Sequence, residues 1–370
     1  MDWKKLRKTV SQYVPLWSWI LFALFAAALV MTGVIHRSER VAQTLHDGIG
    51  VILRAIPATF TSWIPISLAE FLLVSSPLLL GLLIAFLSSR MKRSLKHGLR
   101  ATVAILSLVS LIYTFSVFAV EPGFYVATVD KTVGIERRDL SPEELYEAAL
   151  ILVEDIREDL PYVTYPQKTY SAMTFSYREL NQKLNEAYGT LCDRYEGFHR
   201  LYANTKPVML SEPWTYTHIS GMYTFFTGEA NVNVNYPDFI VVSSAAHEMA
   251  HQRGINREDE ANFVAYLVCS SSDDHYIRYC GNLDMLNEVL SKLYAASYEL
   301  YLKAEAEVPD EIKRENTAYS QFFDPYRETV VSEVSTAVNN AYISSNNQPA
   351  GVKSYGLVVD LAVAYLLQSE

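Results

Sequence analysis

The stretch AAHEMAHQRGINREDEANFVAYL, residues 245–267, predicts two buried helices joined by a glycine turn. In its first half, His247 and His251 are four residues apart, so on a helix both imidazoles project from one face and can hold one metal ion. Glu248 lies beside them, where a carboxylate can take up and release protons. This H-E-x-x-H spacing is typical of a zinc site, and Zn²⁺ is therefore the predicted cofactor.

A hydrolytic zinc site uses three protein ligands and leaves a fourth position for water, whose pKa the metal lowers toward ~7. The second helix of the stretch begins after Gly254 and offers Glu258, with Asn262 one turn further along. We predict that Glu258 is the third ligand and that Asn262 hydrogen-bonds a ligating histidine and fixes its ring. Glu260 points away from Glu258 on the same helix and is the second choice.

The chemistry expected of this site is hydrolysis of a peptide bond. Glu248 would accept a proton from the zinc-bound water as that water attacks the carbonyl, and would pass the proton to the leaving amine. A further donor should hold the developing oxyanion beside the metal. The sequence does not single out that donor, and four side chains that flank the two helices are the candidates: His218, Tyr223, His275 and Tyr279.

Half of the 370 residues are hydrophobic, and the longest apolar runs lie within the first 120. Three runs, 16–35, 66–89 and 101–120, each have the roughly 20 residues needed to cross about 30 Å of hydrocarbon. Residues 44–65 are apolar but contain charged residues and prolines, which favours an interfacial or re-entrant segment. We predict a membrane anchor with three transmembrane helices over residues 1–120 and a second domain over residues 121–370.

Basic residues are distributed unevenly among the loops of this anchor. The amino terminus carries four and the loop between the second and third spans carries five, whereas the loop after the first span carries three. Because positively charged loops stay in the cytoplasm, we expect a cytoplasmic amino terminus and an extracytoplasmic second domain. The residues counted are Lys4, Lys5, Arg7 and Lys8; Arg90, Lys92, Arg93, Lys96 and Arg100; and Arg37, Arg40 and Arg54.

The two parts of the chain also differ in net charge. Residues 1–120 hold 12 Lys and Arg against 4 Asp and Glu, a net of +8, and residues 121–370 hold 19 against 37, a net of −18. A domain so acidic is not expected to bind nucleic acid or to lie flat on anionic lipid. Contact with membrane lipid is therefore expected through the anchor alone, and the oligomeric state is not indicated.

Three cysteines, Cys192, Cys269 and Cys280, are few for an exported domain. The sequence permits a disulfide between Cys269 and Cys280 but does not require one. The favoured interpretation is that the cysteines are buried thiols in an apolar environment. Their spacing does not resemble that of a metal cluster.

The second helix resembles a known zinc-ligand helix. The pattern E-x-E-A-N-F-x-A-x-L, residues 258–267, is similar to the third-ligand helix of the gluzincin metallopeptidases, in which the glutamate four residues before an Asn or Asp binds the metal. This resemblance favours Glu258 over Glu260. One departure concerns spacing, because the third ligand of gluzincins often lies much farther along the chain, whereas six residues separate His251 from Glu258 here.

Most of the chain resembles an uncharacterised family of bacterial membrane proteins, described as a domain of unknown function, with three amino-terminal spans and an H-E-x-x-H domain. The family implies zinc, peptidase activity and a place in the bacterial cytoplasmic membrane, but it implies no particular substrate. The matching stretches are KPVMLSE (206–212), GMYTFFTGEANVN (221–233), HEMAHQRG (247–254), EDEANF (258–263) and GVKSYG (351–356).

A β-rich region precedes the metal helix, over residues 207–240. Its segment 227–235 ends in strict alternation, which places Asn231, Asn233 and Asn235 on one face and the valines between them on the other, as in a half-buried strand. Zinc peptidases commonly add an extended substrate to an edge strand near the metal helix, so these asparagines are candidate substrate-binding residues. A surface strand with an asparagine face fits the pattern equally well.

The sequence thus predicts an α-helical membrane anchor followed by a mostly α, α+β domain, which by resemblance is a zincin-like metallopeptidase domain. The predicted function is that of a membrane-anchored zinc-dependent peptidase acting on a peptide or protein substrate. Two alternatives stay open at this point. One is a non-catalytic zinc-binding membrane sensor or assembly protein, and the other is an amidase that cleaves cell-wall peptides.

Overall fold

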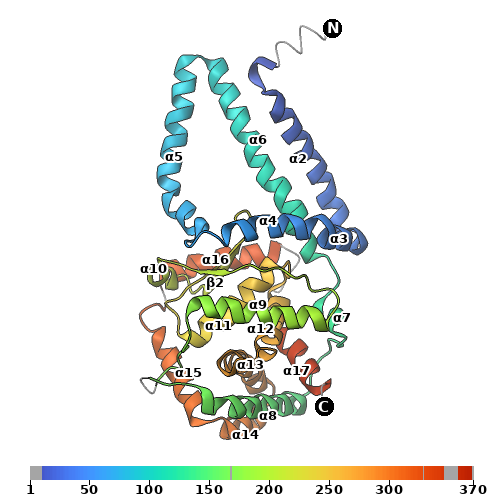
Figure 1. The fold of residues 1–370 in the computed structure, drawn as a ribbon, viewed down its shortest axis with the longest axis vertical. Coiled ribbons are helices and arrows are strands. Elements are labelled where there is room, and N and C mark those ends of the chain that lie inside the picture. The colour runs from blue at the N-terminus through green and yellow to red at the C-terminus, as the bar shows by residue number, and fades with distance from the viewer. Residues whose placement is uncertain (1–10, 167–168, 328, 346–356, 369–370) are drawn as a thin grey trace.

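The computed structural model describes residues 11–166, 169–327, 329–345 and 357–368. The described chain is mostly helical and contains one small sheet. Three long helices extend from a globular domain, and two shorter helices lie across the junction between them (Figure 1).

The three long helices are α2 (Leu16–Ile35), α5 (Leu68–Arg93) and α6 (Leu95–Ala119). Each is long and apolar enough to cross a membrane, which is compatible with the predicted anchor. The side chain of Ser94 ends the turn between α5 and α6 by accepting a hydrogen bond from the backbone N–H of His97. Helix α6 begins six residues before the predicted span. The prediction followed the apolar run alone, and the first turns of α6 are helical but contain basic residues.

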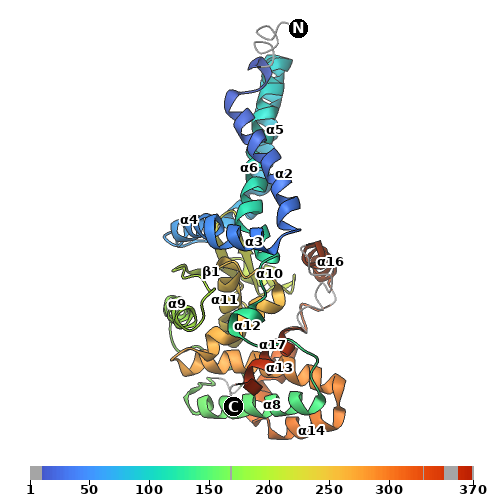
Figure 2. The ribbon, with the colours of Figure 1, turned by 90° about the vertical axis from the view of Figure 1, so that its right-hand side faces the viewer.

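Helices α3 (Glu39–Leu45) and α4 (Val51–Thr61) are joined by a π-helical turn, His46–Gly50. They run across the ends of the long helices, between these and the globular domain (Figures 1 and 2). The π-helical turn and α4 fall within residues 44–65, the segment for which the sequence favours an interfacial position. The structure thus places it where the anchor meets the domain.

The globular domain packs its helices around α13 (His275–Ala296), which contacts α8 (Pro142–Asp159), α11 (Asp238–Gln252) and α12 (Glu258–Ser270). Apolar side chains of these helices form one continuous core. Helices α8 and α9 (Tyr177–Arg194) each begin with a capping box. In it, the side chain of a serine accepts from the backbone N–H of the glutamate three residues later, and the side chain of that glutamate accepts from the backbone N–H of the serine. The remaining helices are α7 (Val129–Val133), α10 (Ser211–Thr215), α14 (Tyr298–Glu307), α15 (Asp310–Phe322), α16 (Val330–Ser345) and α17 (Val358–Gln368), with the short 3₁₀ turns Glu121–Phe124 and Leu160–Tyr162.

The sheet has three short strands in the order β1 (Thr205–Pro207), β3 (Glu229–Val232), β2 (Gly221–Thr224). Strand β1 is parallel to β3, and β2 is antiparallel to it. Strand β3 is therefore the central strand, paired on both sides, and β2 is an edge strand among the described residues.

The expectation of a half-buried asparagine strand is corrected by this topology. Asn231 and Asn233 are buried, 3% and 0% exposed, and Asn235 lies beyond the end of β3. Their amides are satisfied inside the protein, because Asn231 accepts from Ser67 Oγ and Asn233 donates to Thr215 Oγ1. Alternation of polar and apolar residues shows which side chains share a face of a strand. It cannot distinguish a solvent-exposed polar face from one buried against other polar groups.

All three cysteines are free thiols. Cys269 and Cys280 are buried, and burial raises the pKa of both, so they are inert core residues.

Candidate metal centre

Helix α11 presents the H-E-x-x-H motif from the centre of the domain. Asp238 lies in its first turn, where the negative charge interacts favourably with the positive end of the helix dipole. The Asp238 carboxylate also accepts a hydrogen bond from the backbone N–H of Met173. The small neighbours that predict a buried helix, Ala245, Ala246 and Ala250, are all completely buried. Because α11 also packs on β3 and α12, the motif is held by a rigid scaffold.

A glycine turns the chain from α11 into α12. Gly254 has a φ of +99°, a conformation that other residues adopt only with strain. A β-carbon at this position would lie 2.6 Å from Cζ of Arg54 and from Cε1 of His46, so there is no room for a side chain. The turn lets α12 begin at Glu258, directly opposite the histidines.

The side chains of His247, His251 and Glu258 converge. One ligand atom from each lies within 4.8 Å of the other two. Nε2 of His247 is 3.4 Å from one oxygen of Glu258, and Nε2 of His251 is 3.7 Å from the other. The two imidazole rings are perpendicular, with centroids 4.6 Å apart, so they meet edge to face and are not stacked. Nε2 of each ring faces the Glu258 carboxylate.

The backbone carbonyl of Ile255 orients His251. It lies 2.7 Å from Nδ1, and because a carbonyl only accepts, Nδ1 carries a proton and Nε2 is the ring nitrogen directed at the site. The sequence assigned this orienting role to Asn262. In the structure, Asn262 lines the cavity instead, and it makes no hydrogen bond to Nδ1 of His247, which is buried without a partner among the described residues.

Glu258 and Glu260 have different surroundings. Burial alone would raise the pKa of the Glu258 carboxyl, but His251 and His247 offset this and hold it well below its usual range. The same carboxylate raises the pKa of His251 to about 9 against the effect of burial. Glu260 faces away from the histidines and accepts from Arg257 and from the backbone N–H of Val129. The structure therefore brings Glu258, and not Glu260, to the two histidines.

Glu248 lies in a buried position beside the three converging side chains. It accepts a hydrogen bond from the backbone N–H of Tyr223, while its Oε2 has no partner among the described residues. Burial raises the pKa of this carboxyl above its ordinary value. A carboxyl with a free oxygen and a raised pKa is a stronger base than an ordinary carboxylate.

A cavity of about 950 Å³ opens in front of the site. Its wall includes β2, α11, α12, α13 and α16. Asp284 and Glu288, one turn apart on α13, also line it, and desolvation raises the pKa of Asp284 to about 6 and that of Glu288 to about 7. Sequence reasoning missed these two acids. Their spacing of four residues, which places both carboxylates on one face of a helix, is the signal that could have indicated them.

The four candidate oxyanion donors fall into two groups. His218 and Tyr223 line the cavity, although Nε2 of His218 is 2.7 Å from the carbonyl of Tyr326. His275 and Tyr279 do not line it. Nδ1 of His275 lies 2.7 Å from a carboxylate oxygen of Asp159, and the hydroxyl of Tyr279 hydrogen-bonds Glu315 in the core.

Comparison with known proteins gives one match. No curated protein and no solved structure shows significant similarity to the chain. A family model does match, over residues 47–363, which include helix α4, two of the three long helices and nearly all of the globular domain. The chain therefore belongs to the family described as "Protein of unknown function (DUF3810)".

Proposed function

We propose that this protein is a membrane-anchored zinc-dependent peptidase with a zincin-like metal centre. The observation that carries the proposal is the convergence of His247, His251 and Glu258 beside a buried Glu248. A purely structural ion-pair cluster would not require a glutamate with an unsatisfied buried oxygen, nor an adjoining cavity.

The donor set suits zinc. Two imidazole nitrogens and one carboxylate oxygen form a common catalytic zinc ligand set, which leaves one position open. Zinc bonds of about 2.0–2.1 Å in a tetrahedral arrangement place neighbouring ligand atoms about 3.3 Å apart. The observed separations of 3.4 and 3.7 Å between the histidine nitrogens and Glu258 need little adjustment to meet this.

A bound zinc ion would supply a Lewis acid and a water acidic enough to ionise near neutral pH. Glu248 would take the proton of the attacking water and return it to the amine nitrogen that leaves. His218 or Tyr223, which line the cavity, would donate a hydrogen bond to the oxyanion. An extended peptide would bind along the edge strand β2, since β3 is already paired on both sides.

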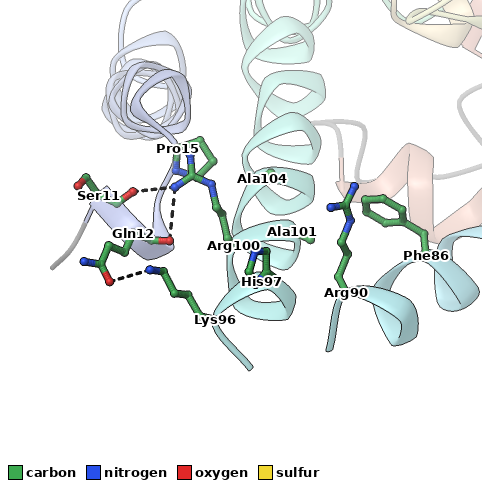
Figure 3. A pocket seen from close by; sticks show the side chains of 10 residues that line it. All are labelled: Ser11, Gln12, Pro15, Phe86, Arg90, Lys96, His97, Arg100, Ala101 and Ala104. Carbon is green, nitrogen blue, oxygen red and sulfur yellow. Dashed lines mark hydrogen bonds between the residues drawn. The ribbon is translucent and has the colours of Figure 1, made fainter. Parts of the chain in front are cut away.

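We propose that the amino terminus is cytoplasmic and the globular domain extracytoplasmic. Basic side chains gather near the turn between α5 and α6 (Figure 3), at the end of the long helices that is farthest from the domain (Figure 1). There Arg90, Lys96 and Arg100 surround a hollow of about 570 Å³, and Arg100 donates to the carbonyl of Ser11 while Lys96 donates to Gln12. A basic cluster of this kind favours the cytoplasmic side.

The substitution Glu248→Gln tests the proposed function. The variant should bind as much zinc as the wild type and fail to cleave a randomised peptide library, while Glu154→Gln on the exposed face of α8 should cleave it normally. Equal cleavage by Glu248→Gln and wild type would contradict the proposed mechanism. Zinc binding without any cleavage of peptides would favour a sensor, and cleavage of isolated cell-wall fragments alone would favour an amidase.

A further inference from the structure

Helix α4 has the surface of a helix that lies in a membrane interface. Its exposed residues Ile52, Ile56 and Phe60 follow one another at intervals of four positions and are 54%, 64% and 71% exposed. Arg54 and Ala58 on the opposite face are buried at the junction with the globular domain. An amphipathic helix of this kind lies with its apolar face in the boundary of the bilayer, so the junction in Figure 1 marks the membrane surface.

The hairpin between β2 and β3 touches both α4 and α6. Gly228 at its turn approaches α4 so closely that a β-carbon would lie 2.4 Å from the backbone nitrogen of Ala58. The ring of Phe225 stacks on Phe115 of α6, with centroids 6.3 Å apart and planes 19° apart. Phe115 is four residues before the end of α6, about 6 Å inside it at 1.5 Å per residue. The hairpin therefore reaches the depth of the last turn of a membrane-spanning helix.

The same hairpin begins at the metal centre. Gly221, the first residue of β2, is so close to Glu248 that a β-carbon would lie 2.5 Å from Oε1. Phe225 is four positions after Gly221, and four residue steps span at most about 14 Å. The backbone beside Glu248 consequently lies within about that distance of the Cα of Phe225, whose ring stacks on α6.

This short distance is fixed by buried polar contacts. Glu229 of β3 accepts from the backbone N–H groups of Leu68 and Ala69 at the start of α5, and it also pairs with buried Lys206 of β1. On the other side of the site, Asn256 in the turn between α11 and α12 donates to the carbonyl of Val120 just after α6. The sheet and the metal helices are thus attached to two membrane-spanning helices, and the domain is not on a flexible linker.

The cavity has an apolar end on the same side. Val120 and Phe124, just after α6, line it together with Phe225 and Phe226 of the hairpin. We infer that the substrate is a membrane-anchored polypeptide, cleaved in the extended segment that emerges from the bilayer beside α6. This inference rests on the proposed peptidase function and names its substrate class. A soluble peptide would gain nothing from a site held this close to the membrane surface.

Paired substrates in proteoliposomes of the zinc-loaded full-length protein test the inference. One randomised peptide library carries a transmembrane anchor and cleavable residues directly after it, and a second has a Gly/Ser spacer of about 20 residues between the same parts. A third is soluble. We expect the first library to be cleaved at least about tenfold faster than either of the others, with cuts within the first few residues outside the bilayer. The spacer controls for local concentration, which both anchored libraries share.

A variant pair locates the effect on α4. Ile56→Asp should lower cleavage of the directly anchored library at least about threefold and leave the soluble library unchanged, because it opposes membrane contact of α4. Leu302→Asp, a matched change at an exposed residue of α14, should alter neither. Equal rates for all three libraries, or cuts spread evenly along the spacer, would overturn the inference and leave the peptidase proposal standing. Failure to cleave any library would contradict the peptidase proposal itself.

Discussion

Gly221 and Glu248 are in direct contact, and a β-carbon on residue 221 would lie 2.5 Å from Oε1, 2.6 Å from Cγ and 2.8 Å from Cδ of the glutamate. The edge strand and the proposed general base therefore determine each other's position. Strand β2 can lie this close to α11 only because residue 221 has no side chain.

Substituting Gly221 with alanine should displace the Glu248 carboxylate and leave the metal ligands in place. A displacement of about 1 Å at a reacting group can cost about 100-fold in rate, so we expect kcat to fall by about that factor with zinc content unchanged. Gly81→Ala is the matched control, since a β-carbon there meets nothing within 4 Å. Loss of zinc in Gly221→Ala, or unchanged kcat, would show that this contact does not position the base.

The acidic ligand can be distinguished from its neighbour by metal affinity. Glu258→Ala should lower zinc affinity by more than about 100-fold. Removing a residue that only hydrogen-bonds a metal ligand already lowers affinity by up to about 100-fold, and removing the ligand itself should cost more. Glu260→Ala should retain zinc, because Glu260 binds Arg257 and Val129 on the other side of the helix. Competition with a chelator of known affinity measures both. Similar losses in the two variants would make the assignment of Glu258 wrong.

Local spacing is enough to predict which three side chains come together at the candidate metal centre. Four residues on a helix place His247 beside His251, and a glycine turn of fixed length returns Glu258 to them. Nothing in that spacing shows that the carbonyl of Ile255 orients His251 in place of Asn262, because a backbone partner has no sequence signature.

Contacts between distant segments account for what the sequence does not predict. Asn231 is hydrogen-bonded to Ser67, 164 residues away, and alternation alone predicts a half-buried strand where the structure has a buried central one. The role of β2 as the edge strand depends on strand order, which short strands of this kind do not reveal. The three long apolar helices, by contrast, follow from composition and length alone.

The ion pair between Lys206 and Glu229 should stabilise the junction of anchor and domain. Both side chains are buried, 5% and 0% exposed, so Lys206→Met leaves a buried carboxylate without its cation, which typically costs about 3–5 kcal/mol. Lys131→Met removes a pair that is more than 60% exposed and should cost less than about 1 kcal/mol. Thermal denaturation in detergent compares the two. Equal changes in Tm would contradict a structural role for the buried pair.

Lowering the pH should destabilise the same junction through protonation of His46. Burial, followed by the charge of Arg54, lowers the pKa of His46 well below 6.5, so the folded protein keeps this imidazole neutral while the unfolded chain protonates it. Stability is therefore complete above about pH 6.5 and falls below it, by up to about 1.4 kcal/mol per pH unit. Tm measured at pH 7.5 and 5.5 should show this loss, and His46→Gln should reduce it. An identical pH dependence in the variant would exclude His46 as the cause.

Zinc content measured by mass spectrometry of the purified full-length protein tests the metal centre most directly. After reconstitution with zinc and removal of excess metal, we expect about one zinc ion per chain in the wild type and in Glu248→Gln, and far less in His251→Ala, since that variant lacks one of the three ligands. A wild type without zinc, or a His251→Ala variant that retains as much zinc as the wild type, would contradict the proposal that these side chains form a zinc site.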